Sequence, residues 1–344
     1  MLGRIIRCVF IAVGTSVTVG QAAPLRVCTT TPDLGSLVRT IGGPEVEVTV
    51  FARGSEDPHF LEARPSFIKA LSQAQLLLVN GLDLEVSWLP PLLIGARNAA
   101  VQQRARGYFD ASRFVQPLEV PTGTVDRAAG DVHPYGNPHY LLDPINGLKV
   151  ADAIRDSLEQ LRPAARQGFM ERFEAFRARL ASLMLGERLG GKYPIDKVAE
   201  LHALGKLTAF LEAQHETALL GGWFGALRGG EGTKAVADHN VWPYFARRFR
   251  IDIVGLLEPR PGYPPTTKHL QALIEQMRAE HVRLIFGAAY YDPRHARFVA
   301  EHSGAAVVSM ANQPGARPGT DDYLGMIDYD VRAVAAALEK GAAP

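Results

Sequence analysis

The feature that most restricts how this chain can fold is an alternation of strand and helix patterns that occurs twice, before and after one long helical stretch. In the first block, short apolar runs predict strands, and apolar residues spaced by three and four predict helices. The predicted strands are 25–30, 46–51 and 76–80, and the predicted helices are 34–41, 65–72 and 84–93. Strands that alternate with helices favour a parallel sheet covered on both faces.

The long helical stretch covers residues 144–187, where large apolar residues recur at intervals of three and four, with Arg and Glu between them. The pattern predicts one long amphipathic helix, or two helices with a bend near Pro163. The second block then predicts strands at 234–237, 251–257, 284–286 and 305–310, and helices at 242–250, 266–280 and 293–302. The simplest interpretation is two similar α/β lobes joined by a helix.

The first two dozen residues differ from the rest of the chain. Arg4 and Arg7 precede an apolar, uncharged run over 8–19, and small residues follow it up to Ala23. This pattern predicts a secretory signal peptide over 1–22, with the mature protein beginning near Ala23. The run is shorter than the roughly 20 residues that a membrane-spanning helix needs. Cys8 lies at the start of the run, so no lipid anchor is expected.

Composition excludes some classes of function. A chain of 344 residues, 47% of them hydrophobic, can bury a large core, and its length favours two domains over one. It carries 37 Lys and Arg against 36 Asp and Glu, so neither nucleic acid nor anionic lipid is an expected partner. Only Cys28 would remain after cleavage of the signal peptide, so no internal disulfide is expected.

Three of the ten histidines each follow a predicted strand and have turn-forming neighbours. His59 comes after Asp-Pro, His139 after Asn-Pro, and His239 stands between Asp and Asn. Ligands bind outside the carboxyl ends of strands in open α/β sheets. A preceding proline restricts the backbone, and an acidic or amide neighbour can hold the second ring nitrogen. The spacing therefore indicates a metal site, although Asp-Pro and Asn-Pro also simply start turns.

Several segments resemble the periplasmic zinc and manganese solute-binding proteins of ABC metal importers, the ZnuA/TroA-like family. The resemblance covers nearly the whole mature chain in the expected order. The matching segments are EDPHFLEARPS at 56–66, VNGLDLE at 79–85, GNPHYLLDP at 136–144, HNVWPYFA at 239–246, EPRPG at 258–262, KHL at 268–270 and DYLGM at 322–326.

The resemblance implies two Rossmann-like lobes with parallel sheets, joined by a long rigid helix, with the metal held between the lobes. The implied divisions are a lobe over 23–143, the linking helix over 144–188 and a second lobe over 189–344. The first-lobe ligands would be His59 and His139, and the second-lobe ligand would be His239. The protein would be a periplasmic receptor, expected to be a monomer, that passes its metal to the membrane permease of an ABC importer.

The chain departs from the family pattern at the loop after the last strand. Relatives usually supply a carboxylate ligand there, but residues 309–315 contain no Asp or Glu. The candidates to complete four-coordination are Asn312, Asp321, Asp322, Glu258 or a bound water. The sequence does not choose among them.

Three neutral imidazoles suit Zn²⁺, whereas Mn²⁺ prefers more oxygen ligands. Zinc is therefore the expected cargo, with a Mn²⁺ or Fe²⁺ receptor on the same scaffold as the alternative. Many zinc members carry a histidine- and acid-rich loop, but residues 112–138 contain only His133. We interpret His133 as an ordinary loop residue rather than a transient docking point for metal.

A zinc hydrolase is the alternative from another class, since three histidines with an open fourth position can activate water. The chain has neither a His-Glu-x-x-His pair nor a Gly-x-Ser-x-Gly motif. Glu62 and Asp292 are the nearest candidates for a general base, and both are equally well explained as surface charges. We therefore expect a binding protein and no enzyme activity. A surface adhesin would need an anchor that the N-terminal sequence does not suggest.

Overall fold

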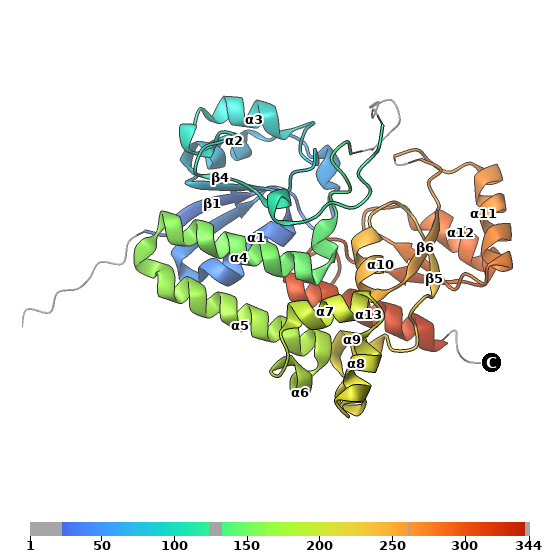
Figure 1. The fold of residues 1–344 in the computed structure, drawn as a ribbon. Coiled ribbons are helices and arrows are strands. Elements are labelled where there is room, and N and C mark those ends of the chain that lie inside the picture. The colour runs from blue at the N-terminus through green and yellow to red at the C-terminus, as the bar shows by residue number, and fades with distance from the viewer. Residues whose placement is uncertain (1–22, 124–132, 261, 341–344) are drawn as a thin grey trace, which may run out of the picture.

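The computed structural model describes residues 23–123, 133–260 and 262–340 (Figure 1). The expected signal peptide over 1–22 lies outside the described residues. Within those residues, no helix is long and apolar enough to cross a membrane.

The first lobe contains a four-stranded parallel sheet in the order β2-β1-β3-β4. Its strands are β1 (Leu25–Thr29), β2 (Val46–Val50), β3 (Leu76–Val79) and β4 (Tyr108–Asp110), and its helices are α1 (Pro32–Gly42), α2 (Pro65–Gln73) and α3 (Leu89–Ala96). Helix α3 begins five residues later than predicted, and Pro90 in its first turn suits this start. The short strand β4 was not predicted from the sequence.

The second lobe repeats this topology with the strand order β6-β5-β7-β8, again fully parallel. Its strands are β5 (Lys234–Ala237), β6 (Asp252–Leu256), β7 (Leu284–Gly287) and β8 (Ala306–Ser309), and its main helices are α10 (Pro243–Phe249), α11 (Thr267–Ala279) and α12 (Pro293–Ser303). The prediction of two α/β lobes with parallel sheets is confirmed.

The linking stretch consists of two helices that lie side by side, α4 (Pro144–Leu161) and α5 (Arg166–Leu185) (Figure 1). The alternative of one continuous helix over 144–187 is wrong. Arg162, the residue before Pro163, has φ −139° and ψ 73°, because proline disfavours helical geometry in its predecessor. The lobes are nevertheless joined by a long helix, because α5 contacts both α1 of the first lobe and α9 (Gly222–Ala226), which precedes the strands of the second.

Shorter helices follow α5, and a long helix ends the described chain. They are α6 (Glu187–Gly190), α7 (Ile195–Ala203), α8 (Leu207–Ala213) and α13 (Tyr323–Lys340). Helix α13 packs on β8 and α9 and also contacts α1 of the first lobe. The last element of the chain therefore returns to the beginning of the fold.

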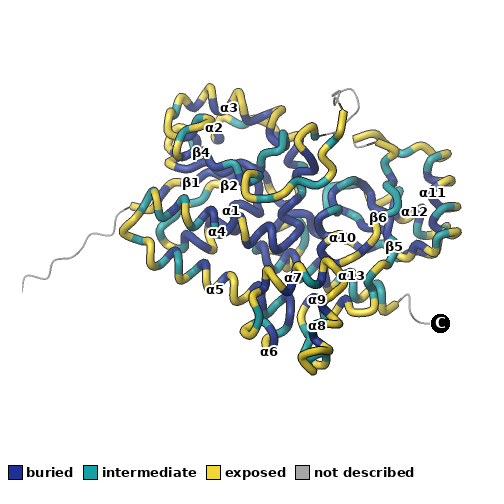
Figure 2. The backbone as a smooth tube through the Cα atoms, viewed as in Figure 1, coloured by how far each residue is buried: buried dark blue, intermediate teal, exposed yellow. Residues whose placement is uncertain are grey.

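One hydrophobic core runs through both lobes. It includes Val27 and Ile41 of the first lobe, Phe169 of α5, and Phe245 and Phe286 of the second lobe. Figure 2 shows buried backbone passing through the middle of the molecule, between the two sheets. Two smaller clusters lie under α2 and α3 and under α11 and α12. The lobes therefore share apolar packing instead of each enclosing a separate core.

A buried ion pair joins the start of α4 to α10 of the second lobe. Arg248 Nε and Nη2 each lie 2.7 Å from one carboxylate oxygen of Asp143. Arg248 Nη1 donates to the carbonyl of Ala199 in α7 at 2.8 Å, and Asp143 also accepts from the N–H of Ile145, capping α4. Asp143 is 2% exposed and Arg248 6%. Because two parallel hydrogen bonds hold the pair, its geometry is well defined.

We predict that Arg248→Met lowers the free energy of unfolding by about 3–5 kcal/mol, because it leaves the Asp143 carboxylate buried without a partner. The double variant Asp143→Asn/Arg248→Met should recover much of that loss, since Asn can still cap α4 and no charge is left unpaired. Urea denaturation of both variants and of the wild type measures this. A double variant no more stable than Arg248→Met would contradict the prediction.

His202 of α7 is buried beside this ion pair. Its ring stacks on Phe224 with the centroids 3.8 Å apart, and Nδ1 lies 3.1 Å from the carbonyl oxygen of Arg248. Burial, and then the positive charge of Arg248, lower the pKa of His202 to about 4. The folded protein therefore holds this imidazole neutral where an unfolded chain would protonate it.

We predict that His202 makes stability fall as the pH drops from about 6.5 to 4, by on the order of 3 kcal/mol in total, because only the unfolded chain takes up a proton there. His202→Phe keeps a ring against Phe224 and removes the titration. The difference in unfolding free energy between wild type and variant should therefore change with pH across this window and be constant above about pH 7. Parallel pH profiles would contradict this assignment.

Candidate metal centre

His59 lies in a short 3-10 turn (Pro58–Phe60) that follows β2, and its ring is held from one side. Asp57 accepts from the His59 backbone N–H at 3.0 Å, and its carboxylate lies 2.7 Å from Nδ1. Trp88 donates to the carbonyl of Pro58, and Ser87 donates to that of His59. Because the carboxylate can only accept, Nδ1 carries the proton and Nε2 presents a lone pair.

His139 directly precedes a second 3-10 turn (Tyr140–Leu142). Asn137 Oδ1 accepts from the His139 backbone N–H, Asn80 donates to the carbonyl of Pro138, and the Tyr140 hydroxyl donates to the carbonyl of Asn80. The end of β3 thereby fixes the loop that carries His139. The rings of His59 and His139 have centroids 5.3 Å apart.

His239 follows β5 in the second lobe and is 3% exposed. Its Nδ1 lies 2.6 Å from Glu258 Oε2, in the loop after β6, and its ring stacks on Tyr291 with centroids 5.1 Å apart. Asp238 accepts from the His239 backbone N–H at 2.8 Å. His239 and His59 are therefore held in the same manner, each with a carboxylate on Nδ1.

The loops of the two lobes are hydrogen-bonded to each other. Asn137 Nδ2 donates to the carbonyl of Asn240 at 2.9 Å, and the Tyr244 hydroxyl donates to the carbonyl of Asn137 at 2.8 Å. Glu119 accepts from the side chains of both Asn137 and Asn240. These contacts link the His139 loop directly to the residue after His239.

Burial, followed by the nearby charges of His59, His239 and His133, lowers the pKa of His139 well below its usual value. The rings from both lobes are therefore within electrostatic reach of each other, and His139 is neutral, as a metal ligand must be. Among the described residues, no group of three or more His, Cys, Asp or Glu side chains is arranged so that it could hold a metal ion.

His133 occupies a position that the sequence analysis did not anticipate. We interpreted it as an ordinary loop residue, but its ring lies against His59, with centroids 5.1 Å apart and the two Nε2 atoms 3.1 Å apart. His133 lies six residues before His139 in the same turn-rich stretch, and this proximity is the sequence signal for its place near the other histidines.

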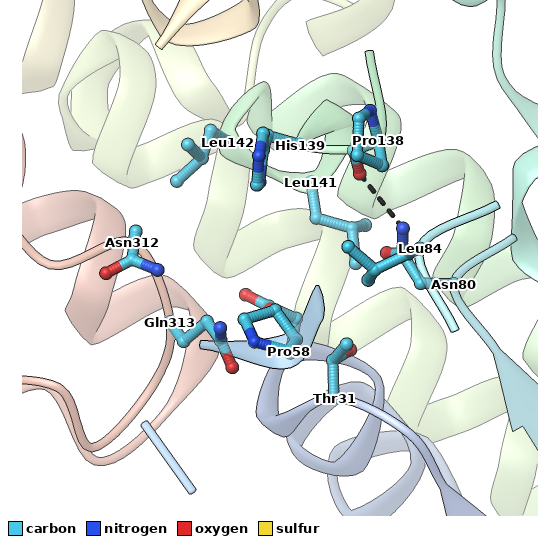
Figure 3. Close-up of a pocket in the computed structure, with 11 residues that line it drawn as sticks. Thr31, Pro58, Asn80, Leu84, Pro138, His139, Leu141, Leu142, Asn312 and Gln313 are labelled. Atoms are coloured by element: carbon cyan, nitrogen blue, oxygen red, sulfur yellow. Dashed lines mark hydrogen bonds between the residues drawn. The ribbon is translucent and has the colours of Figure 1, made fainter. Parts of the chain in front are cut away.

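The other candidates for a fourth ligand lie in different surroundings. Glu258 is bonded to Nδ1 of His239, behind the ring. Asp321 is exposed, and Asp322 accepts from the N–H of Gly325 at the start of α13. Asn312 lines a small cavity together with His139 (Figure 3).

This cavity has a volume of about 20 Å³ and lies between the loop after β8 and the ends of the first-lobe strands (Figure 3). Four oxygen atoms that line it have no hydrogen-bond partner within the described part of the chain: Thr31 Oγ1, Asp33 Oδ1, Asn312 Oδ1 and Gln313 Oε1. Burial raises the pKa of Asp33 to about 7. The space is sufficient for one water or a small ion, with oxygen acceptors around it.

A model of the family described as "Zinc-uptake complex component A periplasmic" matches residues 27–185 and 226–337. The metal ABC transporter substrate-binding lipoprotein ScbA of Streptococcus cristatus is 22% identical over 325 residues, which are 93% of this chain and 90% of that protein. The manganese ABC transporter substrate-binding lipoprotein PsaA of Streptococcus pneumoniae is 22% identical over 322 residues, 92% and 89% of the two chains.

Solved structures agree on the fold. A crystal structure of ZnuA superimposes with a TM-score of 0.65 at 21% identity, covering 91% of this chain and 98% of the other. The Mn-bound periplasmic metal binding protein from Candidatus Liberibacter asiaticus gives 0.62 at 16% identity, with the same coverage. Because its sequence matches the family model over most of its length, this chain belongs to the zinc-uptake component A family, whose members are metal-binding substrate-binding components of ABC transporters and not enzymes.

Proposed function

We propose that this protein is a periplasmic receptor that binds one divalent transition metal, zinc, on His59, His139 and His239 and delivers it to the membrane permease of an ABC importer. The observation that carries the proposal is a buried histidine in each lobe, His59 and His239, each with a carboxylate on Nδ1. A structural histidine needs no such arrangement, whereas metal-binding imidazoles commonly have a carboxylate or carbonyl on the second nitrogen.

The ligand atoms favour zinc over manganese. Imidazole nitrogen suits Zn²⁺, while Mn²⁺ prefers carboxylate and water oxygen. Asp57 and Glu258 keep the imidazoles oriented and increase their basicity, and their negative charge offsets part of the charge of the ion. A manganese receptor is the competing proposal, since some relatives are named as manganese proteins.

Periplasmic location, a cleavable signal peptide and a monomeric state belong to the proposal as well. The N-terminal sequence, with its basic start, short apolar run and small residues, supports export and cleavage. The matched relatives are named as lipoproteins. In this chain Cys8 is the first residue of the apolar run.

We predict that the purified protein binds one Zn²⁺ and that His59→Ala, His139→Ala and His239→Ala each weaken binding at least about tenfold, because each removes a direct ligand. Elemental analysis gives the stoichiometry, and calorimetry with a competing chelator gives the affinity.

His302→Ala is the matched control, because His302 is an exposed histidine on α12. Wild-type protein without metal affinity, or zinc binding that is indifferent to all three site variants, would overturn the proposal.

The orienting carboxylates give a separate prediction. Asp57→Asn and Glu258→Gln should each reduce zinc affinity by about 10–100-fold while the protein still binds one ion, because the imidazoles remain but lose their charged partner. Asp321→Asn, which alters an exposed carboxylate, is the control. Equal affinities in all four proteins would show that Asp57 and Glu258 have no part in metal binding.

A further inference from the structure

One short contact between two histidines includes a residue that is not among the three expected ligands. His133 Nε2 lies 3.1 Å from His59 Nε2. His133 reaches this position from the first lobe, and a hydrogen bond connects its ring to the backbone of Leu82, just beyond the end of β3. Both rings are therefore held from behind, with their Nε2 atoms facing each other.

The hydrogen-bond partners of the two rings indicate which nitrogen atoms face each other. Asp57 holds the proton of His59 on Nδ1, which leaves a lone pair on Nε2. His133 Nε2 lies against His59, so the nitrogen left to donate to Leu82 is Nδ1. With Nδ1 of both rings engaged in this way, the two Nε2 atoms face each other, which is the placement of two nitrogen ligands around one ion.

The distance suits a shared metal ion. With Zn–N bonds of about 2.0–2.1 Å and tetrahedral angles, two nitrogen ligands of one zinc stand about 3.3 Å apart. The observed 3.1 Å is within a few tenths of an ångström of that value. A carbonyl behind His133 and a carboxylate behind His59 are the usual outer partners of metal-binding histidines.

We propose that His133 is the fourth ligand of the captured metal, which completes a site of four imidazoles; this inference rests on the proposed function. The loop after β8, residues 309–315, contains Asn312 and Gln313 and no Asp or Glu that could serve as a ligand. The ligand set then contains no anionic oxygen. Such a site selects zinc, copper or nickel and discriminates against manganese.

X-ray absorption of the zinc-loaded full-length secreted protein tests this, because scattering from the imidazole rings counts histidine ligands directly. We expect four imidazoles in the wild type and three imidazoles plus one oxygen in His133→Ala. The variant should still bind one zinc, at least about tenfold more weakly. Its preference for zinc over manganese, measured by competition, should also fall, because the open position admits water.

His302→Ala again controls for the loss of an unrelated histidine, and circular dichroism confirms that His133→Ala is folded. Three imidazoles plus an oxygen already in the wild type, with affinity unchanged in His133→Ala, would overturn the assignment of His133 and leave the proposed function standing. Asn312→Ala then shows whether that oxygen comes from the cavity beside His139. A wild-type protein that binds no zinc would overturn both proposals.

Discussion

The loops that carry His139 and His239 are held relative to each other by the buried pair of Asp143 and Arg248. Asp143 follows His139 by four residues and caps α4, while Arg248 follows His239 by nine residues within α10. Their two hydrogen bonds therefore join the segments that carry one histidine from each lobe. A desolvated pair contributes little net stability compared with apolar packing, but it permits only one arrangement of its partners.

Around this pair, polar side chains form hydrogen bonds with the loops at the carboxyl ends of the strands. Asn80, Asn137 and Tyr244 satisfy backbone groups of the histidine loops, and Asp57 and Glu258 orient the rings. Buried polar groups without partners would be costly, so each loop conformation depends on its neighbours. The protein itself therefore holds the histidine rings in place, and a ligand bound there would order few additional side chains.

Much of the fold could be predicted from the sequence, because apolar runs such as Leu76–Val79 are strong and bounded by turn residues. The strand β4 could not, since it has three residues and only Phe109 among them is buried. The break at Pro163 remained open because the apolar periodicity continues through it. At the candidate site, His59, His139 and His239 follow from their turn-forming neighbours and from the family resemblance, and they stay predictions. Periodicity does not describe a loop, so the contact of His133 with His59 could not be predicted.

The structure also distinguishes between two roles of Glu258 that the sequence does not distinguish, a direct metal ligand and a partner of His239. Glu258 was one of several candidates for a direct ligand, and only the structure places it behind His239 on Nδ1. Nothing in the eighteen residues between His239 and Glu258 indicates which nitrogen would face the carboxylate.

The core shared by both lobes restricts how far the lobes can move apart. If the lobes parted as rigid bodies and exposed about 200 Å² of apolar surface, the free energy would rise by about 5 kcal/mol. That amount reduces the population of the open form by a factor of several thousand. A local rearrangement that exposes less apolar surface costs correspondingly less free energy. A conformational change in this protein is therefore expected to rearrange loops while the two lobes stay packed on their common core.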